Sequence, residues 1–210
     1  AQYFQVNTNT VFFTSSWHEY FRIIISGWTE YQKKSGIDNS ETIIITRKNL
    51  PSKVIDIFHS RNPFLSVRFI SLDSHIASNL PFLEQLKQYQ SKYTLVLITL
   101  MNDDTVIYKK KDLEKIITFC HENQYLLWLD VTDSLYHYHS SFIELSPYFD
   151  FITFNHTCAG SVIPSGVIIK KSSVLLAQQT FGGSQERGLR TGTENLLGAI
   201  FLGEAISLIR

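Results

Sequence analysis

The sequence has no excess of charge of either sign, because 19 lysines and arginines balance 19 aspartates and glutamates over its 210 residues. A neutral chain lacks the electrostatic footprint of a protein that binds nucleic acid or an anionic membrane surface. No apolar run approaches the roughly 20 residues that span a bilayer. Ala1 to Thr10 hold no basic segment followed by an apolar one, so no secretory signal is visible. We therefore expect a cytoplasmic protein that binds neither nucleic acid nor membrane.

Cysteine is scarce, and metal ligands do not cluster along the chain. Cys120 and Cys158 are too few for a disulfide framework. Cys120 falls on the apolar face of a predicted helix, where a small buried side chain is the expected role. His137 and His139 would share one side of a strand, but no third ligand lies near them in the sequence. No metal site is expected.

Apolar segments rich in β-branched residues alternate with amphipathic segments along most of the chain. Runs such as the three isoleucines within 42–46 suit strands that are covered on both faces, as in a parallel sheet. The clearest helix is predicted at 112–123, where apolar residues recur at the spacing of one helix face. The alternation predicts an α/β fold in a single domain, residues 1–210, with a mostly parallel sheet sandwiched by helices. We expect strands at 11–14, 42–46, 66–71, 94–100, 126–130, 149–154 and 166–169, and further helices from Pro51 to His59, from Asn79, and from Glu194 to Arg210.

The most distinctive segment of the chain is polar and covers residues 182–195, GGSQERGLRTGTEN. Its two arginines, its alternating threonines and glycines and its single leucine are not typical of a buried strand or an amphipathic helix. The segment closely resembles a loop of the class V aminotransferases, specifically of the NifS-like cysteine desulfurases. In that family the loop crosses the dimer interface. The resemblance implies that Thr193 reaches the pyridoxal phosphate of a partner subunit.

The order of predicted elements is likewise similar to the large, cofactor-binding domain of these enzymes, the aspartate aminotransferase-like fold of pyridoxal phosphate-dependent transferases (fold type I). The resemblance covers nearly the whole chain. It implies that the family's N-terminal arm and C-terminal small domain are absent. The small domain carries the arginine that grips the substrate carboxylate and the mobile cysteine that accepts sulfur.

Two stretches resemble parts of the family's cofactor site. Residues 11–19, VFFTSSWHE, resemble the phosphate loop, with His18 at the position of its threonine and the bulky Trp17 at the position of an alanine. The strand that ends at Asp130 resembles the one whose aspartate keeps the pyridine nitrogen protonated, so that the ring withdraws electrons. Judged without the resemblance, Asp130 is equally well explained as an aspartate that caps a strand end or a turn.

Three further positions follow from the same resemblance. Asp133 stands where the family has a glutamine that touches the ring oxygen, and a second carboxylate near the first favours protonation of one of them. Asn102 falls on an asparagine that helps to hold the substrate carboxylate. Pro51 replaces the histidine that stacks on the cofactor, and proline offers no flat π face.

The largest departure from the family lies at residues 151–158, FITFNHTC. The family has a histidine followed by the lysine that forms the Schiff base. Aligned on His156, the lysine position holds Thr157, and aligned without a gap to Gly166 it holds Cys158. Neither side chain forms an imine. The resemblance therefore implies pyridoxal phosphate as the family's cofactor, and at most non-covalent binding of it in this chain.

Three hypotheses follow. The first is a non-catalytic homologue, inactive alone, that forms a homodimer or pairs with an active relative, whose phosphate site Thr193 would complete. The second is an enzyme of altered mechanism that acts on an amino acid, binds pyridoxal phosphate through Asp130 and Thr193, and uses His156 in place of the lysine. The third is a piece of a decayed gene or of a longer protein. A nucleophilic pair of Cys158 and His156 is a further option, although neighbours in sequence rarely point at each other; the expected role of Cys158 is to fill the vacated site.

Overall fold

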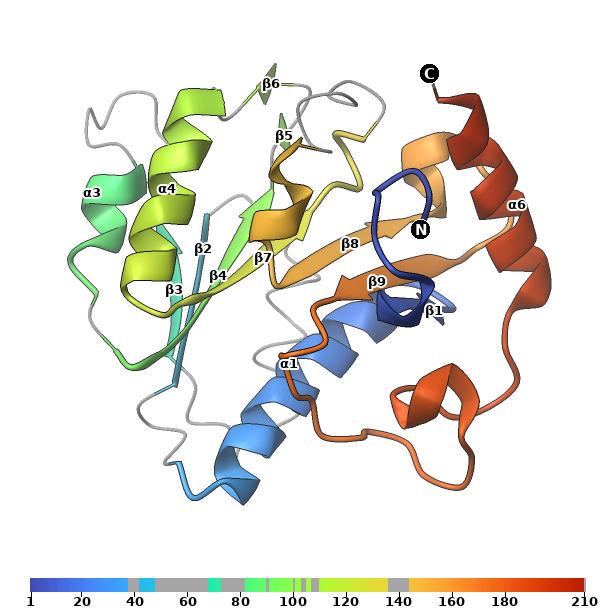
Figure 1. Ribbon diagram of the computed structural model, residues 1–210, viewed down its shortest axis with the longest axis horizontal. Helices are drawn as coiled ribbons and strands as arrows, with labels where there is room; N and C mark the ends of the chain where they lie inside the picture. Colours follow the sequence, from blue (N-terminus) through green and yellow to red (C-terminus); the bar gives the residue numbers. More distant parts are fainter. Residues whose placement is uncertain are drawn as a thin grey trace.

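The computed structural model describes residues 1–37, 42–47, 68–72, 82–89, 91–99, 101–102, 105–106, 110–135 and 144–209. Their centre is a seven-stranded sheet with the order β1-β9-β8-β7-β4-β2-β3 (Figure 1). The strands from β8 to β3 run parallel to one another, whereas β9 is antiparallel to both of its neighbours, β1 and β8. The strands are β1 (Val11–Thr14), β2 (Thr42–Arg47), β3 (Arg68–Leu72), β4 (Tyr93–Thr99), β7 (Leu126–Asp130), β8 (Phe151–Asn155) and β9 (Gly166–Lys170), and a separate short pair is β5 (Met101–Asn102) and β6 (Thr105–Val106).

Helices cover both faces of this sheet, because alternate residues of each central strand point to opposite faces and both sets are apolar. In β4, Leu95 and Leu97 belong to the cluster packed under α1 (Trp17–Lys34). Val96 and Ile98 belong to a second cluster on the other face. That cluster also holds buried side chains of α3 (Phe82–Leu86), α4 (Lys110–Glu122) and α6 (Leu196–Leu208). The predicted α/β fold, with a mostly parallel sheet between helices, is confirmed.

The N-terminal residues lie beside α6 and complete the second cluster (Figure 1). Phe4 stacks on Phe154 of β8 with ring centroids 5.2 Å apart. A cavity of about 510 Å³ opens between residues 1–4 and α6.

Among the described residues no helix combines the length and the apolar character needed to cross a membrane.

The longest described helix, α1, was not among the helices expected from the sequence. Its run Ile23-Ile24-Ile25 is β-branched and buried throughout, which is typical of a strand as well. Ser16 caps its first turn by accepting a hydrogen bond from the amide of Glu19. The helix expected from Asn79 is found as α3, Phe82–Leu86, although residues 79–81 lie outside the described part of the chain. The helix expected from Pro51 and the histidines at 137 and 139 also lie outside the described residues.

Candidate functional site

Several strands end together at one edge of the sheet, and this edge is where open α/β sheets bind ligands. Gly166 pairs with Thr14, the last residue of β1, and also with Asn155, the last residue of β8. Asp130, the last residue of β7, pairs with Thr153 of β8. The start of α1, the end of β7 and the segment after β8 therefore meet at the same edge. All three belong to the segments that the family resemblance associates with a cofactor site.

The Asp130 carboxylate is already bound by groups of the chain itself. Its Oδ2 accepts hydrogen bonds from the Tyr20 hydroxyl at 2.8 Å and from the Thr153 hydroxyl at 2.6 Å. Its Oδ1 accepts the backbone N–H of Thr132 at 3.0 Å, as in an aspartate that caps a turn. The Thr153 oxygen in turn accepts the indole N–H of Trp128 at 2.8 Å, which fixes the direction in which Thr153 donates. Asp130 is thus held in one orientation, and only 8 % of its surface is exposed.

The electrostatics of this network keep the tyrosine neutral. Burial raises the pKa of Asp130, and the hydrogen bonds from Thr153, Tyr20 and Thr132 offset part of that rise because they favour the charged carboxylate. Burial, followed by the negative charge of Asp130, raises the pKa of Tyr20 well above its usual range. The phenol therefore stays protonated, and its O–H donates a hydrogen bond to the carboxylate.

After β8 the chain enters a 3-10 helix, His156–Ala159, that sets the positions aligned with the family's lysine. The Asn155 carboxamide oxygen accepts both the backbone N–H of Thr157 at 2.8 Å and its hydroxyl at 2.5 Å. Burial, followed by the charges of Asp130 and Asp133, raises the pKa of the Cys158 thiol to about 12. A nucleophilic cysteine needs a lowered pKa, so the structure does not favour a Cys158–His156 pair.

His156 itself stands at the edge of the site. Its Nδ1 is buried and has no hydrogen-bond partner among the residues that the structure describes. His18, in the first turn of α1, is exposed, and its ring packs against Trp17 with centroids 3.5 Å apart. Asp133 is exposed in the turn after β7. Asn102 lies in β5, and its side chain is outside the part of the structure that is described.

The segment that the resemblance aligns with the family's Schiff-base lysine contains no lysine. The sequence contains none between Lys115 and Lys170. Lys170 pairs with Phe151 at the first residue of β8, whereas the site lies beyond its last residue, about 13 Å away at 3.3 Å per residue. The Lys170 ammonium donates to the backbone oxygens of Lys171 and Val174 at 3.0 and 2.6 Å. It is therefore occupied at the opposite edge of the sheet.

The residues present do not fit pyridoxal phosphate as a Schiff-base cofactor. Oδ2 of Asp130 is filled by two donors, the lysine position holds Thr157 or Cys158, and the indole of Trp17 stands at the start of α1.

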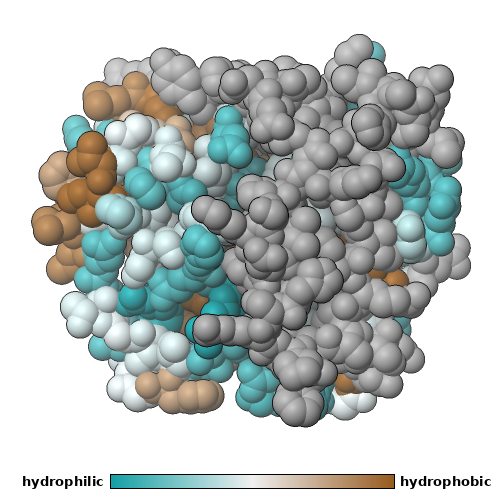
Figure 2. All heavy atoms as spheres, turned by 180° about the vertical axis from the view of Figure 1, so that it is seen from behind, coloured by the Kyte–Doolittle hydropathy of each residue, from teal (hydrophilic) through white to brown (hydrophobic). Residues whose placement is uncertain are grey.

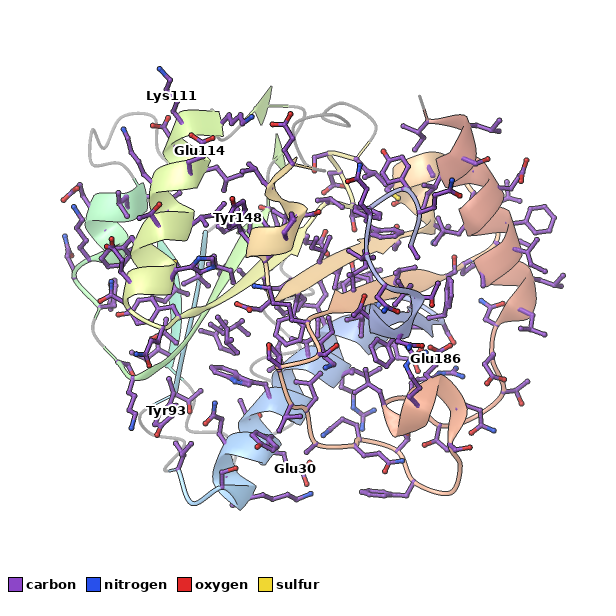
Figure 3. All side chains as sticks on the ribbon, in the orientation of Figure 1. Glu30, Tyr93, Lys111, Glu114, Tyr148 and Glu186 are labelled. Carbon is purple, nitrogen blue, oxygen red and sulfur yellow. The ribbon has the colours of Figure 1, made fainter. Side chains whose placement is uncertain are left out.

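The polar segment 182–195 is a loop, as predicted, and it is docked on the chain's own β1 and α1. The Arg190 guanidinium reaches the Glu19 carboxylate at 3.0 Å and the Ser15 hydroxyl at 2.9 Å. The Glu186 carboxylate accepts the backbone N–H of Phe13 at 3.0 Å, and Figure 3 shows it on the side of the loop that faces β1. The Thr193 side chain is exposed at the surface.

A second arginine strengthens this docking. Arg187 lies over the Phe12 ring, 4.0 Å from its centroid, and donates to the backbone oxygen of Val11. Glu186 and Arg187 both adopt left-handed backbone angles, with φ of 46° and 55°. This conformation costs free energy in non-glycine residues, and it persists only where surrounding contacts fix it. The loop was predicted from the sequence, but its contacts with β1 and α1 were not. The role of Tyr20 was not predicted either, because helix α1 was not expected.

No family model matches the chain. Two curated relatives are both cysteine desulfurase IscS. The protein of Buchnera aphidicola subsp. Baizongia pistaciae is 24 % identical over 196 residues, which cover 92 % of this chain and 46 % of the relative. That of Vesicomyosocius okutanii subsp. Calyptogena okutanii is 30 % identical over 118 residues, which cover 54 % of this chain and 28 % of the relative. The chain thus spans at most about half the length of these relatives.

Solved structures agree with this similarity at the level of the fold. A NifS-like protein superposes with a TM-score of 0.79 at 23 % identity, covering 100 % of this chain and 55 % of its own. DndA from Streptomyces lividans gives a TM-score of 0.79 at 20 % identity, and the match covers 100 % of this chain and 57 % of DndA. CsdA from Escherichia coli, a cysteine desulfurase, gives a TM-score of 0.74 at 17 % identity, and the match covers 99 % of this chain and 54 % of CsdA. The predicted resemblance in sequence and in fold is confirmed.

Proposed function

The chain resembles the cysteine desulfurases in sequence and in fold, and on that premise we propose that it has lost their pyridoxal phosphate chemistry and acts as an associating subunit. The observation that carries the proposal is the segment after β8, where a Schiff-base lysine is replaced by Thr157 or Cys158. An imine requires an amine, and a side chain that supplies both the imine and proton transfer contributes orders of magnitude in rate. The hydroxyl of Thr157 is bonded to Asn155, and the Cys158 thiol is buried with a raised pKa of about 12.

An exposed apolar face of α6 supports the association. Leu196, Leu197, Ile200 and Leu208 are 67, 63, 65 and 75 % exposed. Figure 2 shows apolar atoms gathered at the side of the molecule where α6 lies. Contiguous exposed apolar patches of this kind usually mark an interaction surface. A second copy of this chain or an active relative is the proposed partner.

The loop 182–195 gives the association a specific purpose in this proposal. Arg190, Glu186 and Arg187 fix the loop on β1 and α1 and leave the Thr193 side chain exposed. In a mixed dimer, Thr193 would complete the phosphate site of the active subunit. A cytoplasmic location is part of the proposal and suits two cysteines that are both buried and unpaired.

The proposal is tested by the mass of the purified protein in light scattering and by sulfide release from cysteine in the presence of pyridoxal phosphate. We expect a particle of twice the 24.2 kDa of one chain, or a mixed dimer on co-expression with an active cysteine desulfurase, and no sulfide from this chain alone. Ile200→Glu on the exposed face of α6 should abolish the dimer, whereas Lys111→Glu on the exposed side of α4 should not.

Sulfide release by the chain alone would overturn the proposal, as would a monomer that ignores the active relative. Saturable cofactor binding with amino-acid turnover that is lost in His156→Ala would instead establish the alternative enzyme. The observation that favours this alternative is the buried Nδ1 of His156, which has no hydrogen-bond partner among the described residues.

A further inference from the structure

We infer that Tyr20 is an internal substitute for the cofactor: its ring and hydroxyl occupy the Asp130 end of the site and satisfy that carboxylate without a ligand. The inference rests on the proposed loss of cofactor chemistry and adds which side chain took the place of the pyridine ring. It explains how a site built around a buried acid persists in a chain that has no lysine to anchor the ring.

The hydroxyl of Tyr20 makes the contact that a protonated pyridine nitrogen would make. It donates to Oδ2 of Asp130 at 2.8 Å, and it lies 3.2 Å from the hydroxyl of Thr132. A carboxylate oxygen accepts about two hydrogen bonds, and Thr153 supplies the second one to Oδ2. Asp130 is 8 % exposed and Tyr20 is 1 % exposed, so the contact between them is shielded from solvent.

The ring of Tyr20 is seated as closely as its hydroxyl. A Cβ atom built on Gly166 would lie 2.9 Å from Cδ1 of Tyr20 and 2.5 Å from Oγ1 of Thr14, far closer than real side chains approach each other. Gly166 therefore leaves the space that the tyrosine ring uses. A residue anchored by its ring on β9 and by its hydroxyl on β7 is built into the site.

A neutral hydroxyl is a suitable donor for the buried carboxylate of Asp130. An isolated buried carboxylate is costly, and it needs donors to remain in the fold. Tyr20 supplies a donor that stays neutral and so adds no second charge to be buried. The substitution of a phenol for a cationic pyridinium removes the need for a ligand while it keeps Asp130 in place.

A cavity-rescue experiment tests the inference. Tyr20→Ala removes the ring, and 3-hydroxypyridine is the probe, because it has the cofactor's ring without the aldehyde or phosphate. We expect Tyr20→Ala to melt below the wild type and the probe to restore about 5–10 °C at one hundred times its Kd. The wild type should show no shift, and Tyr20→Ala combined with Asp130→Asn should lose the shift.

Phe21→Ala is the matched control. Phe21 neighbours Tyr20 in α1, is 4 % exposed and belongs to the same apolar cluster, but the structure gives it no bond to Asp130. Its cavity should not bind the probe. Absence of rescue in Tyr20→Ala, or equal rescue in Phe21→Ala, would overturn the inference.

The wild type and Tyr20→Phe decide the matter if Tyr20→Ala does not fold. Tyr20→Phe keeps the ring, so we expect a lower melting temperature and no uptake of the probe. Saturable binding of pyridoxal phosphate to the wild type, lost in Asp130→Asn, would overturn the inference even without catalysis. Sulfide release would refute the proposed function, whereas failed rescue in a colourless, dimeric protein would refute only the role of Tyr20.

Discussion

Arg190→Ala should release the loop 182–195 from the body of the domain. The guanidinium has four acceptors, the Glu19 carboxylate, the Ser15 hydroxyl and the backbone oxygens of Gly192 and Thr193. The last three acceptors are exposed and regain water when the arginine is removed, so their loss costs little. The bond to Glu19 joins two charged side chains that are 14 and 29 % exposed.

A charge-assisted hydrogen bond of this kind contributes about 1.5–3 kcal/mol. Taking about 2 kcal/mol, the population of the open loop should rise roughly 30-fold, since 1.4 kcal/mol corresponds to a factor of ten. The change is local, so the free energy of global unfolding should fall by less than this amount.

Limited proteolysis with trypsin measures the opening, because Arg187 inside the loop stays available as a cleavage site. When opening and closing are fast, the cleavage rate follows the open population, and a roughly 30-fold increase is expected. Arg22→Ala, at an exposed position of α1, is the control and should leave the rate unchanged. A rise of less than about threefold in Arg190→Ala would refute the reasoning, because Glu19 would then not hold the loop.

Three further predictions concern the site. Burial raises the pKa of Asp130 above its ordinary 3.8, so the native state binds the proton more tightly than the unfolded state does. The free energy of unfolding should therefore fall as the pH rises from about 3.8 through the native pKa. Chemical denaturation of Asp130→Asn at a series of pH values should show no such fall over this pH range. Gly166→Ala should lower the free energy of unfolding by about 1–3 kcal/mol, measured in guanidinium, because its methyl group would clash with Thr14 and Tyr20; an unchanged midpoint would contradict the tight seat of that ring. Cys158, whose pKa is raised to about 12, should resist alkylation by iodoacetamide at pH 8 in the native protein and react in denaturant, as mass spectrometry can follow; rapid native labelling would show an activated thiol.

The sequence predicted the strands well where composition alone decides the structure. β2 carries three consecutive isoleucines that are buried on both faces, and such a run has few alternatives to a strand in a covered sheet. The segment Ile23-Ile24-Ile25 has the same composition but lies in α1, because the residues around it complete a helix that packs on the sheet. The direction of β9 was equally hidden, since a strand has the same pattern in both orientations.

The site shows the same division between local and tertiary information. Asp130 was expected at a strand end, and this follows from the order of residues alone. Its partner Tyr20 is 110 positions away, and their contact depends on how α1 crosses the sheet. Arg190 and Glu19 are 171 positions apart, so the loop was recognised as a loop while its anchor was not. Contacts of this range follow from the fold and not from any local pattern.

The exposed face of α6 has a consequence for the cell as well as for the molecule. A chain that shows Leu197, Ile200 and Leu208 to water resembles an unfinished assembly, and chaperones and proteases remove such orphan subunits. Binding a partner protects the folded state by mass action. If a partner subunit covers α6, as proposed, the amount of this chain should follow the supply of that subunit, and the gene dosage of the partner should set the stoichiometry of the pair.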